Sequence, residues 1–161
     1  MSEKLKNFLF CLMMVVTTAG LCSYFTRWGI SNWYSSFEKP TFSPPNYVFS
    51  LAWGIIYTFL IWSYYRILNS NTLFKKEASR LFLLQLLLQV LWCILFFYKG
   101  FILAGFIVIL WLIFTVFRMI KIFLNIDVVA GAMNYFYIMY ICFAAFLNFA
   151  FLYANGYVVH F

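Results

Sequence analysis

Charged residues are scarce in this sequence. They make up 9% of its 161 residues, whereas 66% are hydrophobic and 25% are aromatic. A soluble domain needs far more charge to cover its surface. In lipid, every backbone polar group must be satisfied within a helix or a closed barrel, and long apolar runs without strict alternation favour helices. The sequence therefore predicts one all-α domain, spanning residues 1–161, embedded in a membrane.

Acidic residues and histidines are also scarce. The four acidic residues all lie between or at the ends of the apolar runs, and the one histidine, His160, lies beside the C-terminus. Coupled transporters usually bury a carboxylate near the membrane centre, so this class is disfavoured. A Ser-His-Asp triad has no credible base, and no residue cluster has the spacing of metal ligands. We predict no metal site and no required cofactor.

The cysteines form no CxxC pair. Each one falls within an apolar run: Cys11, Cys22, Cys93 and Cys142. This placement favours small buried hydrophobic residues over disulfides or metal ligands.

Five apolar runs are long enough to cross a bilayer, which takes about 20 residues. They cover residues 5–25, 47–67, 81–98, 101–124 and 129–154. A cleaved signal peptide is an alternative for the first run, but that run continues past a short signal core and has a poor cleavage pattern. Short connections force antiparallel neighbours, so we predict an up-and-down bundle of five transmembrane helices.

The basic residues, which give a net charge of +7, lie at the ends of the runs, which disfavours nucleic acid as a partner. One side of the predicted membrane holds Lys4, Lys6, Arg66, Lys75, Lys76, Arg80, Arg118 and Lys121. The other side holds Arg27, Lys39 and Lys99. Basic residues favour the cytoplasmic side. We therefore predict a bacterial cell membrane with the N-terminus inside and the C-terminus outside, or a mitochondrial outer membrane if the source is eukaryotic.

All three prolines lie in the first connection, residues 26–46, together with several aromatic residues. Proline fixes its backbone, lacks an amide donor and restrains the residue before it, so this segment cannot be a continuous helix. It is predicted to be a stiff loop that forms a lid over an apolar pocket. Within it, Lys39 could pair with a ligand carboxylate, the alternative being a solvated loop charge.

Aromatic and amide residues recur at helical spacing along three runs. They are Trp53, Tyr57 and Tyr64; Gln85, Gln89, Trp92 and Phe96; and Tyr137, Tyr140, Ala144 and Asn148. Residues at these spacings share a helix face, and a flat polycyclic ligand would stack on the tryptophan and tyrosine rings. The alternative is ordinary helix packing, with the amides bonding between helices.

A group of rare residues at fixed spacing has a known counterpart. The group is Trp33-Tyr34, Lys39-Pro40, Pro44-Pro45, Val48, Trp53-Gly54 and Tyr57. It resembles the signature of the translocator protein family, also called TspO/MBR, tryptophan-rich sensory protein or peripheral benzodiazepine receptor. Looser matches in the third and fifth runs extend the resemblance over nearly the whole chain. The resemblance implies a five-helix bundle, commonly dimeric, that binds porphyrins, cholesterol-like lipids and benzodiazepine-type ligands beneath the first loop.

Matching positions imply the pocket and lid residues Trp33, Pro44, Pro45, Val48, Trp53, Trp92, Phe96 and Asn148. Lys39, Tyr57 and Tyr137 complete the predicted ligand-binding set. Some bacterial members of the family promote light-dependent porphyrin breakdown attributed to pocket tryptophans. Trp53 and Trp92 match them, although neither is a firm catalytic residue.

The chain also departs from the family pattern. Gln89, Phe136 and Tyr140 stand where Asn, Pro and Trp are usual, and the loss of that Trp weakens a photochemical role. No basic residue follows Tyr153 or Tyr157, so the cholesterol-recognition pattern is not met.

Together these features predict a membrane receptor or sensor that binds a porphyrin in an aromatic pocket. A light-dependent porphyrin-degrading enzyme and a transporter of sterol, lipid or porphyrin are the alternatives. The expected partners are a porphyrin or another flat apolar ligand, membrane lipids and a second copy of the chain. The dimer prediction uses one small-xxx-small pair, Gly100 and Ala104.

Overall fold

Five helical rods lie side by side in the computed structural model, which describes residues 2–37 and 45–155. The rods are α1 (Glu3–Asn32), α2 (Asn46–Asn69), α3 (Lys75–Cys93), α4 (Ile102–Ile126), and α5 (Val128–Ala132) followed by α6 (Tyr135–Asn155). A 3-10 turn, η1 (Tyr34–Ser36), follows α1, and a π-helical turn, η2 (Ile94–Tyr98), extends α3. Each rod is long and apolar enough to cross a membrane. The predicted all-α, multi-pass bundle is confirmed.

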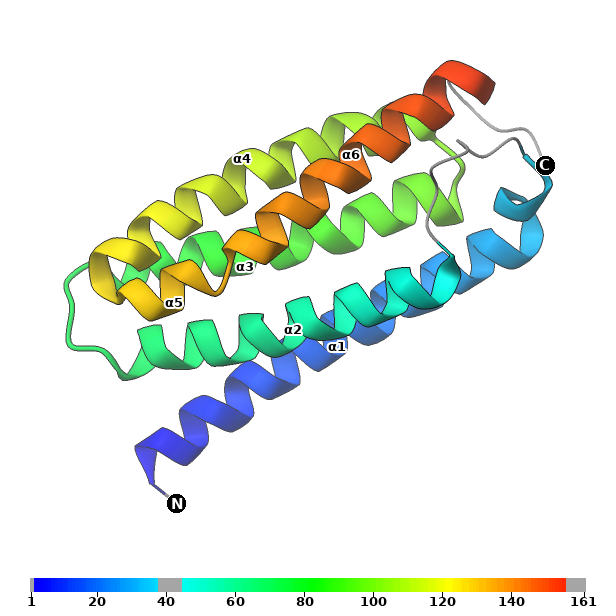
Figure 1. The fold of residues 1–161 in the computed structure, drawn as a ribbon. Helices are drawn as coiled ribbons and strands as arrows, with labels where there is room; N and C mark the ends of the chain where they lie inside the picture. Colours follow the sequence, from blue (N-terminus) through cyan, green and yellow to red (C-terminus); the bar gives the residue numbers. More distant parts are fainter. Residues whose placement is uncertain (1, 38–44, 156–161) are drawn as a thin grey trace.

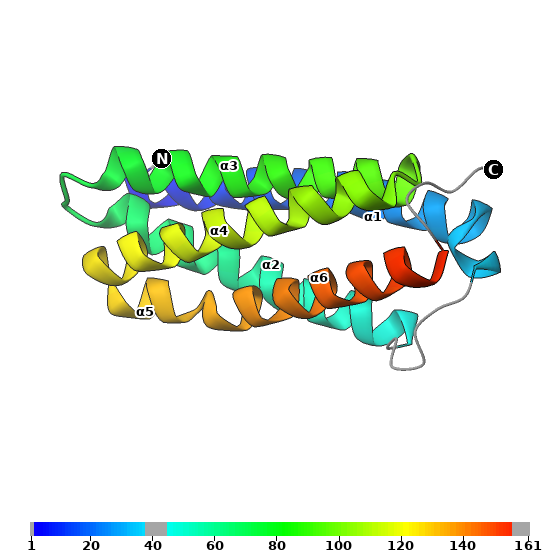
Figure 2. The same ribbon diagram turned by 90° about the horizontal axis from the view of Figure 1, so that it is seen from above.

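The rods form a ring in which neighbouring helices run antiparallel (Figures 1 and 2). The exception is the pair α1 and α3, which lie side by side and run in the same direction. Helix α2 also contacts α5 and α6, and α4 closes the ring between α6 and α3. One end of the bundle therefore gathers η1, η2, the start of α2 and the end of α6. We call it the η1 end, and the opposite end the N-terminal end.

Helix α1 is longer than predicted, because it continues past residue 25 to Asn32. Residues 26–32 were predicted in the lid loop, but they contain no proline, and the Asn32 amide donates to the Trp28 carbonyl at 2.7 Å within the helix. Helix α3 likewise begins at Lys75 instead of residue 81, where the Lys75 ammonium donates to the Leu68 carbonyl at 2.9 Å. Residues 38–44, which include Lys39 and Pro44, lie outside the described residues.

Two glycines let neighbouring helices press closely on η2. A Cβ at Gly29 of α1 would lie 2.5 Å from the Phe97 carbonyl oxygen, and a Cβ at Gly105 of α4 would lie 2.9 Å from the Phe96 Cβ. Real Cβ atoms do not approach other atoms this closely, so larger residues would push α1 or α4 away. These contacts fix η2 between α1 and α4.

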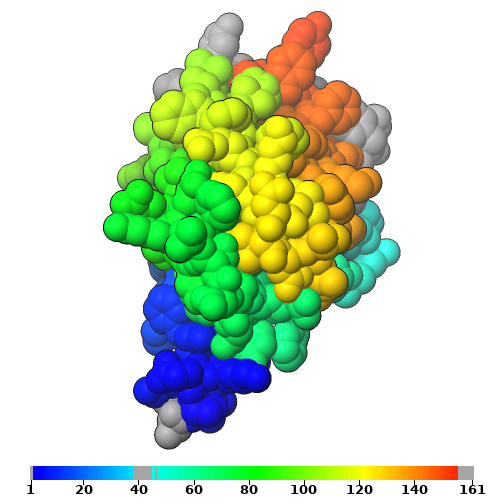
Figure 3. Space-filling view, turned by 90° about the vertical axis from the view of Figure 1, so that its left-hand side faces the viewer, coloured from blue at the N-terminus to red at the C-terminus, as the bar shows by residue number. Residues whose placement is uncertain are grey.

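The N-terminal end of the bundle faces the viewer in Figure 3. It carries the ion pairs of the described chain that join separate helices. Arg66 of α2 contacts Asp127 at 2.8 Å, and Arg118 of α4 contacts Glu77 of α3 at 3.5 Å. Asp127 also caps α5 by accepting from the Ala130 amide at 2.9 Å. Burial acts to raise the Asp127 pKa, but the Ala130 hydrogen bond and the Arg66 charge outweigh it and hold the pKa below its ordinary value.

The fifth span is broken between α5 and α6, although the sequence predicted one continuous helix. A buried polar group bridges the break. The Asn134 amide donates to the Ser63 hydroxyl at 2.7 Å and to the Ala130 carbonyl at 2.8 Å. Ser63 donates to the same carbonyl at 2.8 Å. The Ala130 carbonyl beside the break is thus satisfied by two side-chain donors, as a membrane helix requires.

Two smaller predictions need correction. Gly100 lies in the turn before α4, is buried and has a φ of 65°, so it does not share a helical face with Ala104. Of the four cysteines, which are all free thiols, three are buried as predicted, but Cys142 is exposed on α6. Residues that face lipid are apolar like those that face the core, so a position within an apolar run does not show whether a cysteine is buried.

Candidate functional site

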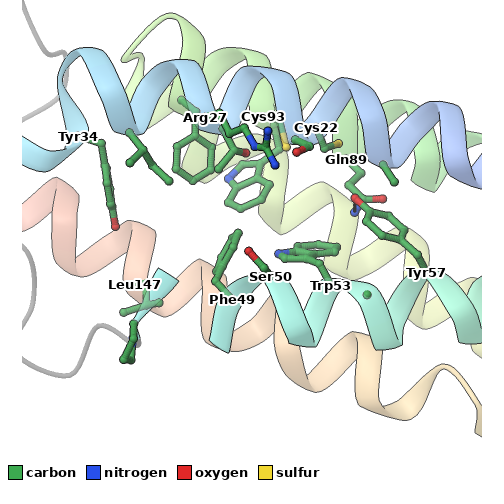
Figure 4. A pocket seen from close by; sticks show the side chains of 18 residues that line it. Cys22, Arg27, Tyr34, Phe49, Ser50, Trp53, Tyr57, Gln89, Cys93 and Leu147 are labelled. Carbon is green, nitrogen blue, oxygen red and sulfur yellow. Dashed lines mark hydrogen bonds between the residues drawn. The ribbon is translucent and has the colours of Figure 1, made fainter. Parts of the chain in front are cut away.

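A cavity of about 700 Å³ opens at the η1 end, between α1 on one side and α2 and α3 on the other (Figure 4). Its walls are largely aromatic. The rings that line it are Tyr34, Phe49, Trp53, Tyr57, Trp92 and Phe97. Ligand pockets in proteins typically have volumes of about 300–1,000 Å³ with mostly apolar walls and a few polar groups. The cavity has the size and wall chemistry of such a pocket.

Two tryptophans from different helices lie beside each other in the cavity wall. The ring centroids of Trp53 and Trp92 are 6.4 Å apart, and their planes differ by 33°. Tyr140 of α6 makes a T-shaped contact with Trp53, with the two ring centroids 5.7 Å apart. Tyr140 thus supports the part of the cavity wall that Trp53 forms.

Asn148 fixes the ring of Trp92 from behind. The Asn148 amide is assigned the orientation that its neighbours favour. Its oxygen then accepts from Trp92 Nε1 at 3.2 Å, and its nitrogen donates to the Ile102 carbonyl at 3.3 Å. Trp92, Asn148 and Ile102 are all buried, so the hydrogen bond from Trp92 to Asn148 holds the indole plane in place.

Amide and phenol pairs close the inner end of the cavity. Gln89 Nε2 donates to the Tyr57 hydroxyl at 3.1 Å, and both residues line the cavity. Deeper in the bundle, the Tyr137 hydroxyl donates to Gln85 Oε1 at 2.8 Å. Gln89 Oε1 is buried and has no partner in the described residues.

At the other end of the cavity, Trp33 anchors η1 to the bundle. Trp33 is 1% exposed, and its Nε1 donates to the Phe97 carbonyl at 2.7 Å. The next residue, Tyr34, stacks on Phe151 of α6 at 5.2 Å and turns its side chain to the cavity. Desolvation by burial raises the pKa of the Tyr34 hydroxyl above its ordinary value.

The predicted site residues separate into groups. Four line the cavity: Pro45, Trp53, Tyr57 and Trp92. Four are buried beside it and support its walls: Trp33, Phe96, Tyr137 and Asn148. Val48 is half-buried in the first turn of α2 and does not line the cavity, and Lys39 and Pro44 lie outside the described residues.

The α1 wall was missed from the sequence. It consists of Ala19, Cys22, Ser23, Thr26, Arg27 and Ile30. The three-, four- and seven-residue spacings of this set define one helix face. This spacing can be read from the sequence, but the first helix was predicted to end at residue 25. Half of the residues on that face therefore fell outside the predicted helix. Phe49, Ser50 and Phe97 were also missed.

Comparisons with known proteins agree with this architecture. The model of the TspO/MBR family matches residues 9–154. The Tryptophan-rich protein TspO of Chlorobaculum tepidum is 29% identical over 161 residues, which cover 96% of this chain and 99% of that protein. Protein CrtK of Rhodobacter capsulatus is 30% identical over 122 residues, or 73% of this chain and 75% of that protein.

A shorter match joins the chain to an archaeal protein. The Tryptophan-rich protein TspO of Archaeoglobus fulgidus is 41% identical over 76 residues, which cover 47% of this chain and 49% of that protein. The chain therefore spans about half the length of this relative. The family match, by contrast, runs through all five rods. The chain is a multi-pass membrane protein that belongs to the TspO/MBR family.

Proposed function

We propose that this protein is a membrane receptor or sensor that binds a porphyrin-type tetrapyrrole in the cavity between α1, α2 and α3. The observation that supports the proposal is the pair of tryptophans, Trp53 and Trp92, in the wall of a cavity of about 700 Å³. A flat macrocycle offers a large π-surface to such rings, and offset stacking with aromatic side chains contributes about 0.5–1.5 kcal/mol per pair beyond area burial. No cofactor is required for binding.

A dark titration tests the proposal. Purified protein in an uncharged detergent is titrated with protoporphyrin while tryptophan fluorescence is followed. We expect saturable quenching, with weaker binding in Trp53→Phe and Trp92→Phe because each variant loses stacking area. Trp111→Phe is the matched control, since Trp111 is 69% exposed on α4 and does not line the cavity. Equal affinities for all three variants and the wild type would place the ligand elsewhere.

A porphyrin-degrading enzyme is the second candidate, favoured by the same 6.4 Å approach of the two indoles. Illumination of the bound complex distinguishes it from a receptor. A new absorbing product that forms in light, and is lost in Trp53→Phe or Trp92→Phe, supports the enzyme. Unchanged porphyrin after illumination supports the receptor, and porphyrin flux across liposomes without chemistry supports a transporter.

We also propose that the N-terminus faces the cytoplasm of a bacterial cell, with the η1 end and the C-terminus outside. The N-terminal end gathers most basic residues of the described chain, and such residues favour the cytoplasmic side. Cysteine labelling of Ser2→Cys in intact cells and in open membranes tests this orientation. A homodimer and bound membrane lipids remain predictions.

A further inference from the structure

One cationic side chain lies in the cavity wall. Arg27 projects from α1 among the cavity side chains (Figure 4), and it is the one charged residue among the 18 that line the cavity. Helix α1 has 30 residues, so it is about 45 Å long, whereas the hydrocarbon core of a bilayer is about 30 Å thick. Arg27 is five residues from the end of α1, which places its guanidinium near the membrane interface.

Arg27 has no acidic partner in the described ranges, 2–37 and 45–155. Two of the three arginines at the N-terminal end do have one, because Arg66 pairs with Asp127 and Arg118 pairs with Glu77. Arg27 is exposed, so its guanidinium is hydrated and accessible to an incoming anion. Among the groups that a ligand could bring to this wall of the cavity, an anionic group complements a guanidinium, whose planar fork of donors matches a carboxylate.

The two ends of the cavity differ in polarity. The inner end has the neutral Tyr57 and Gln89 pair, the middle has Trp53 and Trp92, and the positive charge of Arg27 lies toward the η1 end. An occupant that complements this order has a flat aromatic body and a carboxylate at one edge. A neutral sterol or an esterified macrocycle would leave the guanidinium without a partner.

We infer that the cavity selects flat aromatic acids over their neutral counterparts and that Arg27 binds the carboxylate. The inference deepens the proposed function, on which it rests, by naming the ionised carboxylate of the tetrapyrrole as the group recognised. It assigns to Arg27 a binding role that does not depend on the lid residues. The carboxylate would reach the guanidinium from the η1 end, where the cavity and the solvent-facing part of the bundle meet.

The test compares protoporphyrin, a diacid, with its dimethyl ester. Both share the same macrocycle, so their affinities separate stacking from charge recognition. In uncharged detergent at pH 7.5, we expect the wild type to bind the diacid about tenfold more tightly, the scale of one charge-assisted hydrogen bond. Arg27→Gln should lose this preference while it binds the ester as well as the wild type does. Arg27→Lys should keep only part of it, because an ammonium lacks the planar fork.

The matched control is Lys99→Gln, which removes one positive charge at the same end of the bundle. The Lys99 ammonium lies 5.1 Å from the centre of the Tyr98 ring and does not line the cavity. This variant should keep the full preference for the diacid. Unchanged ester binding by Arg27→Gln also shows that the variant is folded.

Failure of the inference and failure of the proposed function give different results. Equal wild-type affinities for diacid and ester, or an Arg27→Gln variant that weakens both equally, would overturn the carboxylate assignment and leave the porphyrin site in place. If neither porphyrin binds saturably, the proposed function fails, and the same comparison is made with pyrenebutyric acid and its methyl ester. An Arg27-dependent preference for that acid would then support the inference, and its absence would overturn it. Displacement of the diacid by phosphatidylglycerol but not phosphatidylcholine would assign Arg27 to a lipid headgroup instead.

Discussion

Gly54 offers a way to fill the cavity without disturbing the fold. It lies in the middle of α2 and lines the cavity, and a Cβ placed on it meets no other atom within 4 Å. In a helix interior, glycine is about 0.8–1 kcal/mol less favourable than alanine, and leucine is close to alanine. Gly54→Leu should therefore keep or raise the thermal stability of the protein while its side chain enters the cavity.

The same substitution should weaken ligand binding. Extra methylene groups forced into filled space cost about 1–3 kcal/mol, and each 1.4 kcal/mol is a factor of about ten. We expect Gly54→Leu to reduce protoporphyrin affinity by about 5- to 150-fold. The porphyrin absorption shift is the preferred readout, because position 54 adjoins Trp53 and the substitution alters that fluorescence directly.

Gly20→Leu is the matched control. Gly20 is also an interior helix residue, and a Cβ on it also meets no other atom, but it lies on the exposed side of α1 outside this cavity. Its substitution should give the same gain in helix propensity and leave the affinity unchanged. If Gly54→Leu binds protoporphyrin as tightly as Gly20→Leu does, the ligand does not occupy the cavity between α1 and α2, and the reasoning is refuted.

Three further predictions concern stability, measured by thermal unfolding in detergent. Gly29→Ala should lose about 1–3 kcal/mol, because its Cβ would lie 2.5 Å from the Phe97 carbonyl oxygen; a rise in melting temperature would contradict this. Trp33→Phe should cost a similar amount by leaving that buried carbonyl without its 2.7 Å donor, and an unchanged melting temperature would show that the bond is dispensable. Asp127→Asn keeps a capping side chain but loses the charge, so it should cost under about 1 kcal/mol at pH 7 because the arginine partner is largely exposed. The pKa of Asp127 is depressed in the folded protein, so the extra stability of the wild type over Asp127→Asn should be complete above about pH 4 and vanish as the pH falls through the folded pKa. A stability difference that persists in strong acid would contradict the pairing.

The positions of the five spans could be predicted because they depend on composition alone. A run of about 20 apolar residues is sufficient evidence for a membrane helix, and all five were found. The ends were less predictable. Helix α1 continues through Arg27 and Asn32, where hydropathy is low, because a long side chain at the interface can reach water while the backbone stays helical.

The centre of the site was predictable from spacing and from the family resemblance, since Trp53, Tyr57 and Trp92 all line the cavity. The sequence did not distinguish the residues that line the cavity from those that are buried behind them. Trp33 and Asn148 carry the same pattern as lining residues, but each one is buried with its polar atom turned to another helix. Periodicity identifies the inward face of a helix, whereas the distinction between wall and support depends on the packing of all five rods.

The break between α5 and α6 illustrates a different limit. The sequence has no proline at this point, and an apolar run gives no sign that its hydrogen-bond ladder is interrupted. At the interruption, Asn134 donates to Ser63 of another helix, which is 71 residues away in the chain. A long-range pair of this kind is invisible to any local pattern.

The two ends of the bundle are held together by different forces. In the described residues, the ion pairs between helices lie at the N-terminal end, whereas the η1 end is joined by ring contacts around Trp33 and Tyr34. Salt and acid weaken charge pairs but barely affect aromatic packing. A high-salt or acidic buffer would therefore loosen the molecule far from the cavity first. The aromatic packing of the η1 end should therefore persist after the helices at the N-terminal end have begun to separate.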